Sequence, residues 1–187
     1  MMMSVTEVVI RDQFPFWEAA LGLEVPRLAA GTVVITGCGT SYYLAQSLAC
    51  AMNAVGSRAI AVPGAEWARR PESYLADTSD ILVLGLSRSG TTTETVQAIE
   101  ASRKRGWPTF GLSCAEETIL TAAERGLYVP TDPREGIVMS VSASLMLLVG
   151  LRLAGIALPQ AVVAAGRAGV AQVAAAGALL TGRTHFV

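Results

Sequence analysis

Hydroxyl side chains are concentrated between residues 84 and 95, which read LGLSRSGTTTET. Ser87, Ser89 and Thr92 follow an apolar run, and a stretch of helical composition begins directly after them. The N-terminus of a helix leaves backbone N–H groups without partners and carries about half a positive charge. Surrounded by hydroxyls, such a helix start can bind a phosphate group without a lysine. Gly90 lets the backbone curl close to the anion.

An ordinary helix cap is the alternative interpretation of these residues. Ser and Thr are preferred immediately before a helix, and Thr91 with Glu94 has the spacing of a capping box. One cap requires a single hydroxyl, whereas five lie between residues 87 and 93. The cluster therefore favours a phosphate site, although the GxxxxGK[ST] pattern of nucleotide-binding loops is absent.

A second candidate segment, residues 37–41, reads GCGTS. Gly39 exposes backbone N–H groups, and Thr40 and Ser41 offer hydroxyls to a polar ligand. A plain tight turn is about as consistent with two glycines at this spacing. Cys38 is either a packed small side chain, which we favour, or a reactive thiol.

A third candidate segment, residues 135–142, reads EGIVMSVS and leads into a long apolar stretch. Ser140 either contacts a ligand or lies in the first turn of a helix. Glu135 either contacts a ligand or complements the dipole of that helix. The pattern alone leaves both interpretations open.

Short β-branched runs alternate with helical stretches along the chain. Strands buried on both faces and separated by helices are typical of a parallel sheet built from βαβ units. We therefore predict an α/β fold, a three-layer α/β/α domain with a five-stranded parallel, flavodoxin-like sheet. Ligands of such sheets lie beyond the carboxyl ends of the strands, where all three candidate segments fall. The predicted strands are residues 32–36, 58–62, 80–86, 108–112 and 127–130, and the predicted helices are residues 8–21, 41–55, 92–105, 117–125, 136–153 and 159–180.

The composition excludes several classes of partner. Hydrophobic residues make up 52% and charged residues 16% of the 187 residues, which disfavours disorder. The formal net charge of −1 gives no basic excess for nucleic acid. The uncharged residues 136–151 are shorter than the ~20 residues that a bilayer demands, so we expect no membrane contact. Three cysteines without a CxxC pair fit a reducing cytoplasm and predict neither a disulfide framework nor a metal site.

Three segments together resemble the signature regions of the SIS (sugar isomerase) domain family. They are TGCGTSYYLA (36–45), LSRSGTTTET (86–95) and EGIVMSVSASLML (135–147), and the resemblance covers about residues 30–155. It is closest to the first SIS domain of the isomerase half of glucosamine-6-phosphate synthase and to related amino-sugar-phosphate isomerases and deaminases. This resemblance implies a hexose or amino-hexose 6-phosphate as ligand, and we expect no cofactor.

The resemblance also implies a role for individual residues. The implied phosphate contacts are Ser87, Arg88 (through its backbone), Ser89 and Thr92; the implied sugar contacts are Cys38, Thr40, Ser41, Val138 and Ser140; Gly39, Gly90 and Glu135 are further candidates. Two positions depart from the family pattern. Thr91 stands where the synthase-like pattern has glutamate, and Ser142 where it often has lysine.

Isomerisation of a sugar phosphate requires a general base and an acid. In tandem SIS enzymes these groups are implied to come from the second domain and the C-terminal tail, so we assign no catalytic residue. We interpret the single histidine, His185, as a surface or strand-edge residue.

We expect a helical lead-in (residues 1–29), a SIS domain (residues 30–156) and an Ala-rich helix followed by the start of a second, absent SIS domain (residues 157–187). The favoured hypothesis is the N-terminal half of a tandem-SIS isomerase or deaminase, because residues 181–187 resemble the opening of another strand. A complete single-domain isomerase acting as an oligomer and a non-catalytic sensor of sugar phosphates are the alternatives. The apolar helices after residue 136 predict a homodimer.

Overall fold

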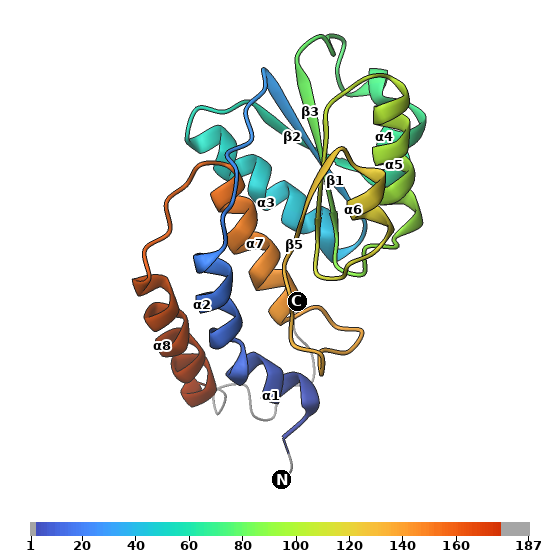
Figure 1. Ribbon diagram of the computed structural model, residues 1–187. Helices are drawn as coiled ribbons and strands as arrows, with labels where there is room; N and C mark the ends of the chain where they lie inside the picture. Colours follow the sequence, from blue (N-terminus) through green and yellow to red (C-terminus); the bar gives the residue numbers. More distant parts are fainter. Residues whose placement is uncertain (1–2, 177–187) are drawn as a thin grey trace.

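Five short parallel strands form one sheet, in the order β2-β1-β3-β4-β5 (Figure 1). The computed structural model describes residues 3–176. The predicted α/β fold with a five-stranded, flavodoxin-like parallel sheet is confirmed. The strands are β1 (Thr32–Gly37), β2 (Ala59–Pro63), β3 (Ile81–Ser87), β4 (Thr109–Ser113) and β5 (Arg125–Tyr128).

Helices cover both faces of the sheet (Figure 1). In β1, Val33 and Ile35 join the core beneath one helical layer, while Val34 belongs to the core on the opposite face. This two-residue alternation within a fully buried strand explains its continuous apolar sequence. One layer holds α3 (Thr40–Ala54) and α7 (Val141–Leu153), and the other holds α4 (Gly64–Arg69), α5 (Thr93–Lys104) and α6 (Thr118–Ala122), with a 3-10 turn at Pro71–Ser73.

Three glycines form a row across the sheet, because Gly85 pairs with Gly111, and Gly111 pairs with Gly126. A Cβ on Gly85 would lie 2.8 Å from a side-chain carbon of Ile99, and one on Gly111 would lie 2.9 Å from the carbonyl oxygen of Ile119. The row thus lets α5 and α6 approach the backbone of the sheet closely.

The N-terminal segment forms two helices, α1 (Val5–Asp12) and α2 (Phe14–Gly22), where the sequence predicted one over residues 8–21. Pro15 causes the break because it has no N–H to donate to the carbonyl four residues earlier. Arg152 joins α2 to α7, donating from Nη1 to Ala20 O (2.7 Å) and from Nη2 to Leu23 O (2.8 Å). The last described helix, α8 (Ala161–Ala176), packs on α2.

Two other features differ from the prediction, and part of the prediction is not tested. The helix predicted from residue 136 begins at Val141, because a carboxylate caps it there, as described below. The short α4 was not predicted, since six residues carry too little periodicity to reveal a helix. The end of the helix predicted over residues 159–180, the segment 181–187 and His185 lie outside the described residues. Among residues 3–176, no helix combines the length and hydropathy that crossing a bilayer requires.

The glycine row generates a prediction about stability. Gly111→Ala should lower the free energy of unfolding by about 1–3 kcal/mol, because the new methyl group meets a backbone carbonyl that cannot rotate away. Gly22→Ala is the control, since its Cβ would meet nothing within 4 Å. Urea unfolding of both variants measures the difference. Equal stabilities would contradict the close packing described for the row.

Candidate functional site

The carboxyl ends of the central strands bring the candidate segments to one edge of the sheet. β1, β3 and β4 are parallel neighbours, and Ser87 pairs with Ser113 where β3 and β4 end. The loop after β1 leads into α3, and the loop after β3 leads into α5. Two helices therefore point their positive ends toward the same edge.

The loop between β3 and α5 presents hydroxyls at different depths. Ser87 is fully buried, and its Oγ lies 2.9 Å from Thr92 Oγ1 in a shared hydrogen bond. Ser89 is exposed, and its Oγ accepts from Thr91 N (3.3 Å) and Thr91 Oγ1 (3.2 Å). Ser87 thus supports Thr92 from below, while Ser89 faces solvent.

The first turn of α5 has no side-chain cap. Thr92 occupies the N-cap position and makes no capping hydrogen bond, so the capping box considered for Thr91 and Glu94 is not formed. The N–H groups of this turn are consequently available to an external acceptor. Of the two interpretations of the hydroxyl cluster, the geometry favours the anion site over the ordinary cap.

Gly90 fixes the path of this loop. Its φ of 71° is a left-handed conformation, and a Cβ there would lie 2.5 Å from the Cβ of Glu117. Its carbonyl oxygen accepts from Ile119 N at 2.9 Å, which attaches the loop to α6. No other residue type combines this backbone conformation with this close approach.

The loop between β1 and α3 lies beside the start of α5. Thr95 Oγ1 donates to Cys38 Sγ at 3.8 Å, and Cys38 is half-buried. Gly39 is the N-cap of α3, with φ 54° and no side-chain cap. Thr40 is exposed, whereas Ser41 is buried against Gly37. The two loops predicted to hold phosphate and sugar are therefore neighbours, and Thr95, which the sequence did not reveal, joins them.

Glu135 caps α7 from within the third segment. Its carboxylate accepts from Ser140 Oγ (3.0 Å), from Ser140 N and from Ser142 N (3.2 Å to Oε1), and also from Thr131 Oγ1 (3.1 Å). Burial opposes ionisation of Glu135, but these hydrogen bonds outweigh it and hold its pKa below the ordinary value. The helix N-terminus is thus already occupied by an internal anion, and Ser140 shares its hydroxyl with that anion.

The same segment is tied down at its start by Asp132. Asp132 is buried, and Arg134 donates to both of its oxygens (Nε to Oδ1, 3.0 Å; Nη2 to Oδ2, 2.6 Å). The side-chain hydrogen bonds from Arg134 lower the pKa of Asp132. Further along, Val138 is 64% exposed and Ile137 is 94% exposed. The segment is therefore anchored at both ends and carries an apolar, solvent-facing middle.

The Arg88 side chain spans from the loop between β3 and α5 to this segment. Its Nη1 donates to Gly136 O at 2.5 Å and lies 3.4 Å from Ile137 O. The Arg88 carbonyl oxygen accepts from Cys114 N at 3.2 Å.

Burial, together with the charge of Glu135, raises the pKa of the Cys114 thiol to about 12, so this thiol is not a nucleophile at neutral pH.

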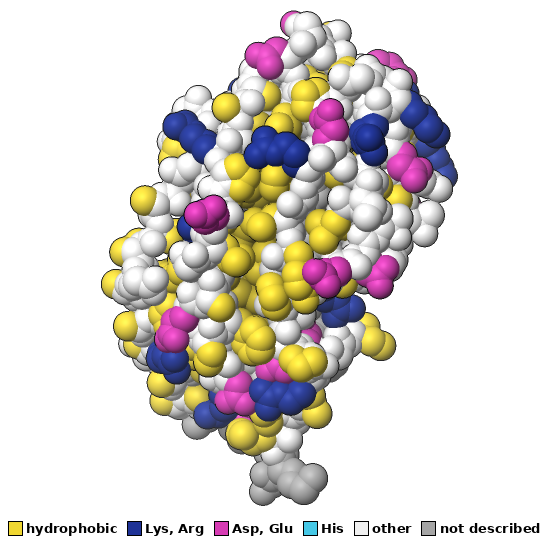
Figure 2. All heavy atoms as spheres, viewed as in Figure 1, with side chains coloured by type: hydrophobic (Ala, Val, Ile, Leu, Met, Phe, Trp, Pro, Cys, Tyr) yellow, Lys and Arg dark blue, Asp and Glu magenta, His cyan; other side chains and the backbone are white. Residues whose placement is uncertain are grey.

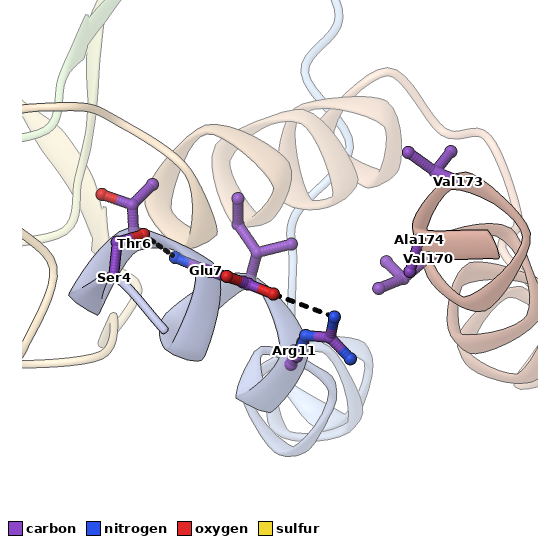
Figure 3. A pocket seen from close by; sticks show the side chains of 8 residues that line it. Ser4, Thr6, Glu7, Arg11, Val170, Val173 and Ala174 are labelled. Carbon is purple, nitrogen blue, oxygen red and sulfur yellow. Dashed lines mark hydrogen bonds and ion pairs between the residues drawn. The ribbon is translucent and has the colours of Figure 1, made fainter. Parts of the chain in front are cut away.

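A cavity elsewhere on the molecule offers a less suitable site. It measures about 330 Å³ and lies between α1 and α8, and Val170 and Val173 line it from α8 (Figure 3). Three of its polar side chains are already paired, since Ser4 accepts from Glu7 N and Glu7 binds Arg11. Within residues 3–176, no group of three or more His, Cys, Asp or Glu side chains is placed to hold a metal. The strand-end edge remains the candidate site.

The amino-acid sequence was compared with models of known protein families, and one of them matches the part of the chain that forms this site. The family model described as "SIS domain" matches residues 28–154, which is more than half of the chain. The chain belongs to the SIS domain family. The match contains all three segments that resembled the family, and it agrees with the parallel sheet and with the loops at its carboxyl edge.

Individual SIS proteins show how far the similarity extends. The chain is 31% identical to a glutamine–fructose-6-phosphate aminotransferase (isomerizing) of Pyrobaculum aerophilum over 111 residues. These residues make up 59% of this chain and 18% of the aminotransferase. A glucosamine-6-phosphate deaminase of Thermotoga maritima superposes with a TM-score of 0.68 and 28% identity, over 90% of this chain and 53% of the deaminase. A protein of Escherichia coli CFT073 superposes with a TM-score of 0.62 and 20% identity, over 90% and 92% of the two chains.

The chain thus spans about half of the deaminase and less than a fifth of the aminotransferase. The relation to these proteins, whose names refer to sugar phosphates, is therefore limited to one part of each of them.

The cap formed by Glu135 generates a prediction about pH. Because the folded-state pKa is lowered, the ionised carboxylate stabilises the fold above its ordinary pKa of 4.5. This stabilisation is lost as pH falls through the lower, folded-state pKa. Glu135→Gln should therefore cost about 1 kcal/mol at pH 7, as expected for a lost helix cap, and the difference from wild type should shrink as pH falls below 4.5 and through the folded-state pKa.

Denaturant unfolding between pH 3 and pH 7 measures this difference. Glu72→Gln is the control, because Glu72 is exposed and takes part in none of the side-chain hydrogen bonds formed within residues 3–176. A stability difference that does not change with pH would show that the charge of Glu135 does not act as described.

Proposed function

We propose that this SIS domain binds a hexose or amino-hexose 6-phosphate at the carboxyl edge of its sheet. The observation that carries the proposal is the uncapped first turn of α5 beneath a loop of hydroxyls. A phosphate dianion there would accept from backbone N–H groups and from Ser89 and Thr92, with Ser87 holding Thr92 in place. The neighbouring loop at Cys38, Gly39 and Thr40 supplies the groups for the sugar.

The class of sugar phosphate is supported by the relatives. The aminotransferase and the deaminase both carry a hexose 6-phosphate in their names, one of them an amino sugar. A site of neutral hydroxyls and backbone N–H groups suits a doubly charged phosphate attached to a polyol, because each ligand oxygen requires its own hydrogen bond. We include Ser41, Val138 and Ser140 as the residues on the sugar side of the site.

We further propose that the domain works as one half of a tandem-SIS isomerase or deaminase. The deaminase of Thermotoga maritima supports this arrangement, because its chain is nearly twice as long as the part that superposes. The alternative, a single-domain isomerase that acts as an oligomer, draws support from the Escherichia coli protein, which superposes over 92% of its length.

The three cysteines form no disulfide bond, and we place the protein in the cytoplasm.

Self-association belongs to the same proposal and rests on α8. The apolar residues of α7 pack inside the domain, so they leave little surface for a partner. In contrast, Val163 is the buried residue of α8, and Val173 is 73% exposed. Apolar side chains cover the edge of the molecule where α8 lies (Figure 2). We propose that a second copy of the chain covers this face of α8.

The ligand proposal predicts a loss of affinity when two hydroxyls are removed. Ser89→Ala with Thr92→Val should weaken binding of glucosamine 6-phosphate at least tenfold, since hydrogen bonds to a charged group contribute roughly 1.5–3 kcal/mol each. Ser47→Ala with Thr121→Val is the control, because those hydroxyls bond only to carbonyls of their own helices. Titration calorimetry compares the three proteins, and equal affinities would rule out the proposed phosphate site.

The self-association proposal predicts a concentration-dependent dimer. Sedimentation over a hundredfold dilution range should show a dimer that dissociates, and Val173→Glu should give a monomer throughout because it places a charge in the buried interface. Val55→Glu is the control, since Val55 is 52% exposed at the end of α3. A wild-type monomer at every concentration would exclude the proposed contact.

A further inference from the structure

The main chain of residues 136–139 has few partners. Among the hydrogen bonds of residues 3–176, those that reach this stretch come from one donor, Nη1 of Arg88, to Gly136 O and Ile137 O. The flanking residues are held separately, by Asp132 and Arg134 before the stretch and by Glu135 at Ser140 after it. Met139 also packs against the core, so within the described residues Arg88 is the hydrogen-bonded link between this stretch and residues 87–92, the loop proposed to hold the phosphate (the phosphate loop).

The donor itself lies in the phosphate loop, 48 residues earlier in the chain. The Arg88 carbonyl is fixed by Cys114 N, so the backbone from which the side chain extends is anchored directly after the end of β4. Within the described residues, the guanidinium group forms no ion pair, and its bonds go to neutral carbonyls. A cation placed between two loops in this way links them and adds positive potential at the phosphate loop.

We infer that Arg88 is a positioning residue that fixes residues 136–138 against the phosphate loop, and so makes recognition of the sugar depend on the loop that holds the phosphate. This inference rests on the proposed function, because it assigns Val138 and its neighbours to the sugar side of that site. It adds a side-chain role to the one implied by family resemblance, in which Arg88 contributes through its backbone. The structure gives its side chain a separate task.

Two roles for Arg88 predict different patterns of affinity. If the guanidinium contributed only charge, its loss would lower the affinity for inorganic phosphate and the affinity for glucosamine 6-phosphate by the same factor, since both ligands carry the phosphate. If it positions residues 136–138, its loss weakens the sugar phosphate more, because only that ligand contacts the third segment. The ratio of the two affinities therefore separates positioning from charge, and a general loss of structure would lower both together.

The test compares wild type, Arg88→Met and Arg88→Lys by calorimetry with inorganic phosphate and with glucosamine 6-phosphate. Arg88→Met should lose about tenfold more affinity for the sugar phosphate than for phosphate, the effect expected for one hydrogen bond from a charged group. Arg88→Lys, which keeps a charged donor on a shorter stem, should restore part of that ratio. Arg103→Met is the matched control, because its Nη1 also donates to a main-chain carbonyl, that of Ala122, at 2.9 Å.

Hydrogen exchange without ligand gives a second measurement. The amides of Ser140 and Ser142, which donate to Glu135 at the end of the stretch, should exchange faster in Arg88→Met than in wild type, whereas those of α5 should not change. If Arg88→Met does not fold, Arg88→Lys decides by the same two measurements. Equal losses for both ligands, or unchanged exchange, would overturn the inference. Wild-type protein that binds phosphate but no sugar phosphate would instead refute the proposed function, and the exchange experiment would still test the contact.

Discussion

Parallel pairing of β1 with β3, and of β3 with β4, is the constraint on which the candidate site depends. Parallel strands end at the same edge, so every helix that follows one of them begins there as well. Two helix starts without side-chain caps, those of α3 and α5, consequently lie beside each other. The N–H groups in the first turn of α5 are the ones left to attract an anion, because those of Ser41 and Tyr42 at the start of α3 already donate to Cys38 O and Gly39 O. The hydroxyls and the glycines of the loops refine a site that the topology has already placed.

Local patterns were sufficient to predict the sheet and the position of the hydroxyl-rich loop between β3 and α5. Apolar runs of strand length, and hydroxyls directly after Leu86, depend on residues that are adjacent in the sequence. Contacts between distant residues were beyond this reasoning. The bond between Thr95 and Cys38 joins residues 57 apart, and that between Arg88 and Gly136 joins residues 48 apart. The late start of α7 also escaped prediction, because a carboxylate five residues before Ser140 takes the place of another helical turn.

Apolar composition was a poor guide to which helix is buried. Both α7 and α8 are nearly free of charge, but α7 crosses α3 closely enough that a Cβ on Gly150 would lie 2.4 Å from a methyl group of Leu48. α8 touches the rest of the domain through α2, where Gly166 lies against the ring of Trp17. The difference comes from the elements that each helix packs against, and these elements cannot be identified from the sequence of the helix itself.

The glycine row at Gly85, Gly111 and Gly126 restricts how this sequence can change over time. α6 is only five residues long and is too short to be helical alone. It is held against the sheet because the glycines beneath it have no side chains that would push it away. A larger residue in the row becomes acceptable only after α6 has moved outward, yet moving α6 also moves Ile119, on which the carbonyl of Gly90 depends. The row, the helix and the loop at Gly90 are therefore mechanically coupled, and a substitution that displaces one of them requires compensating changes in the other two.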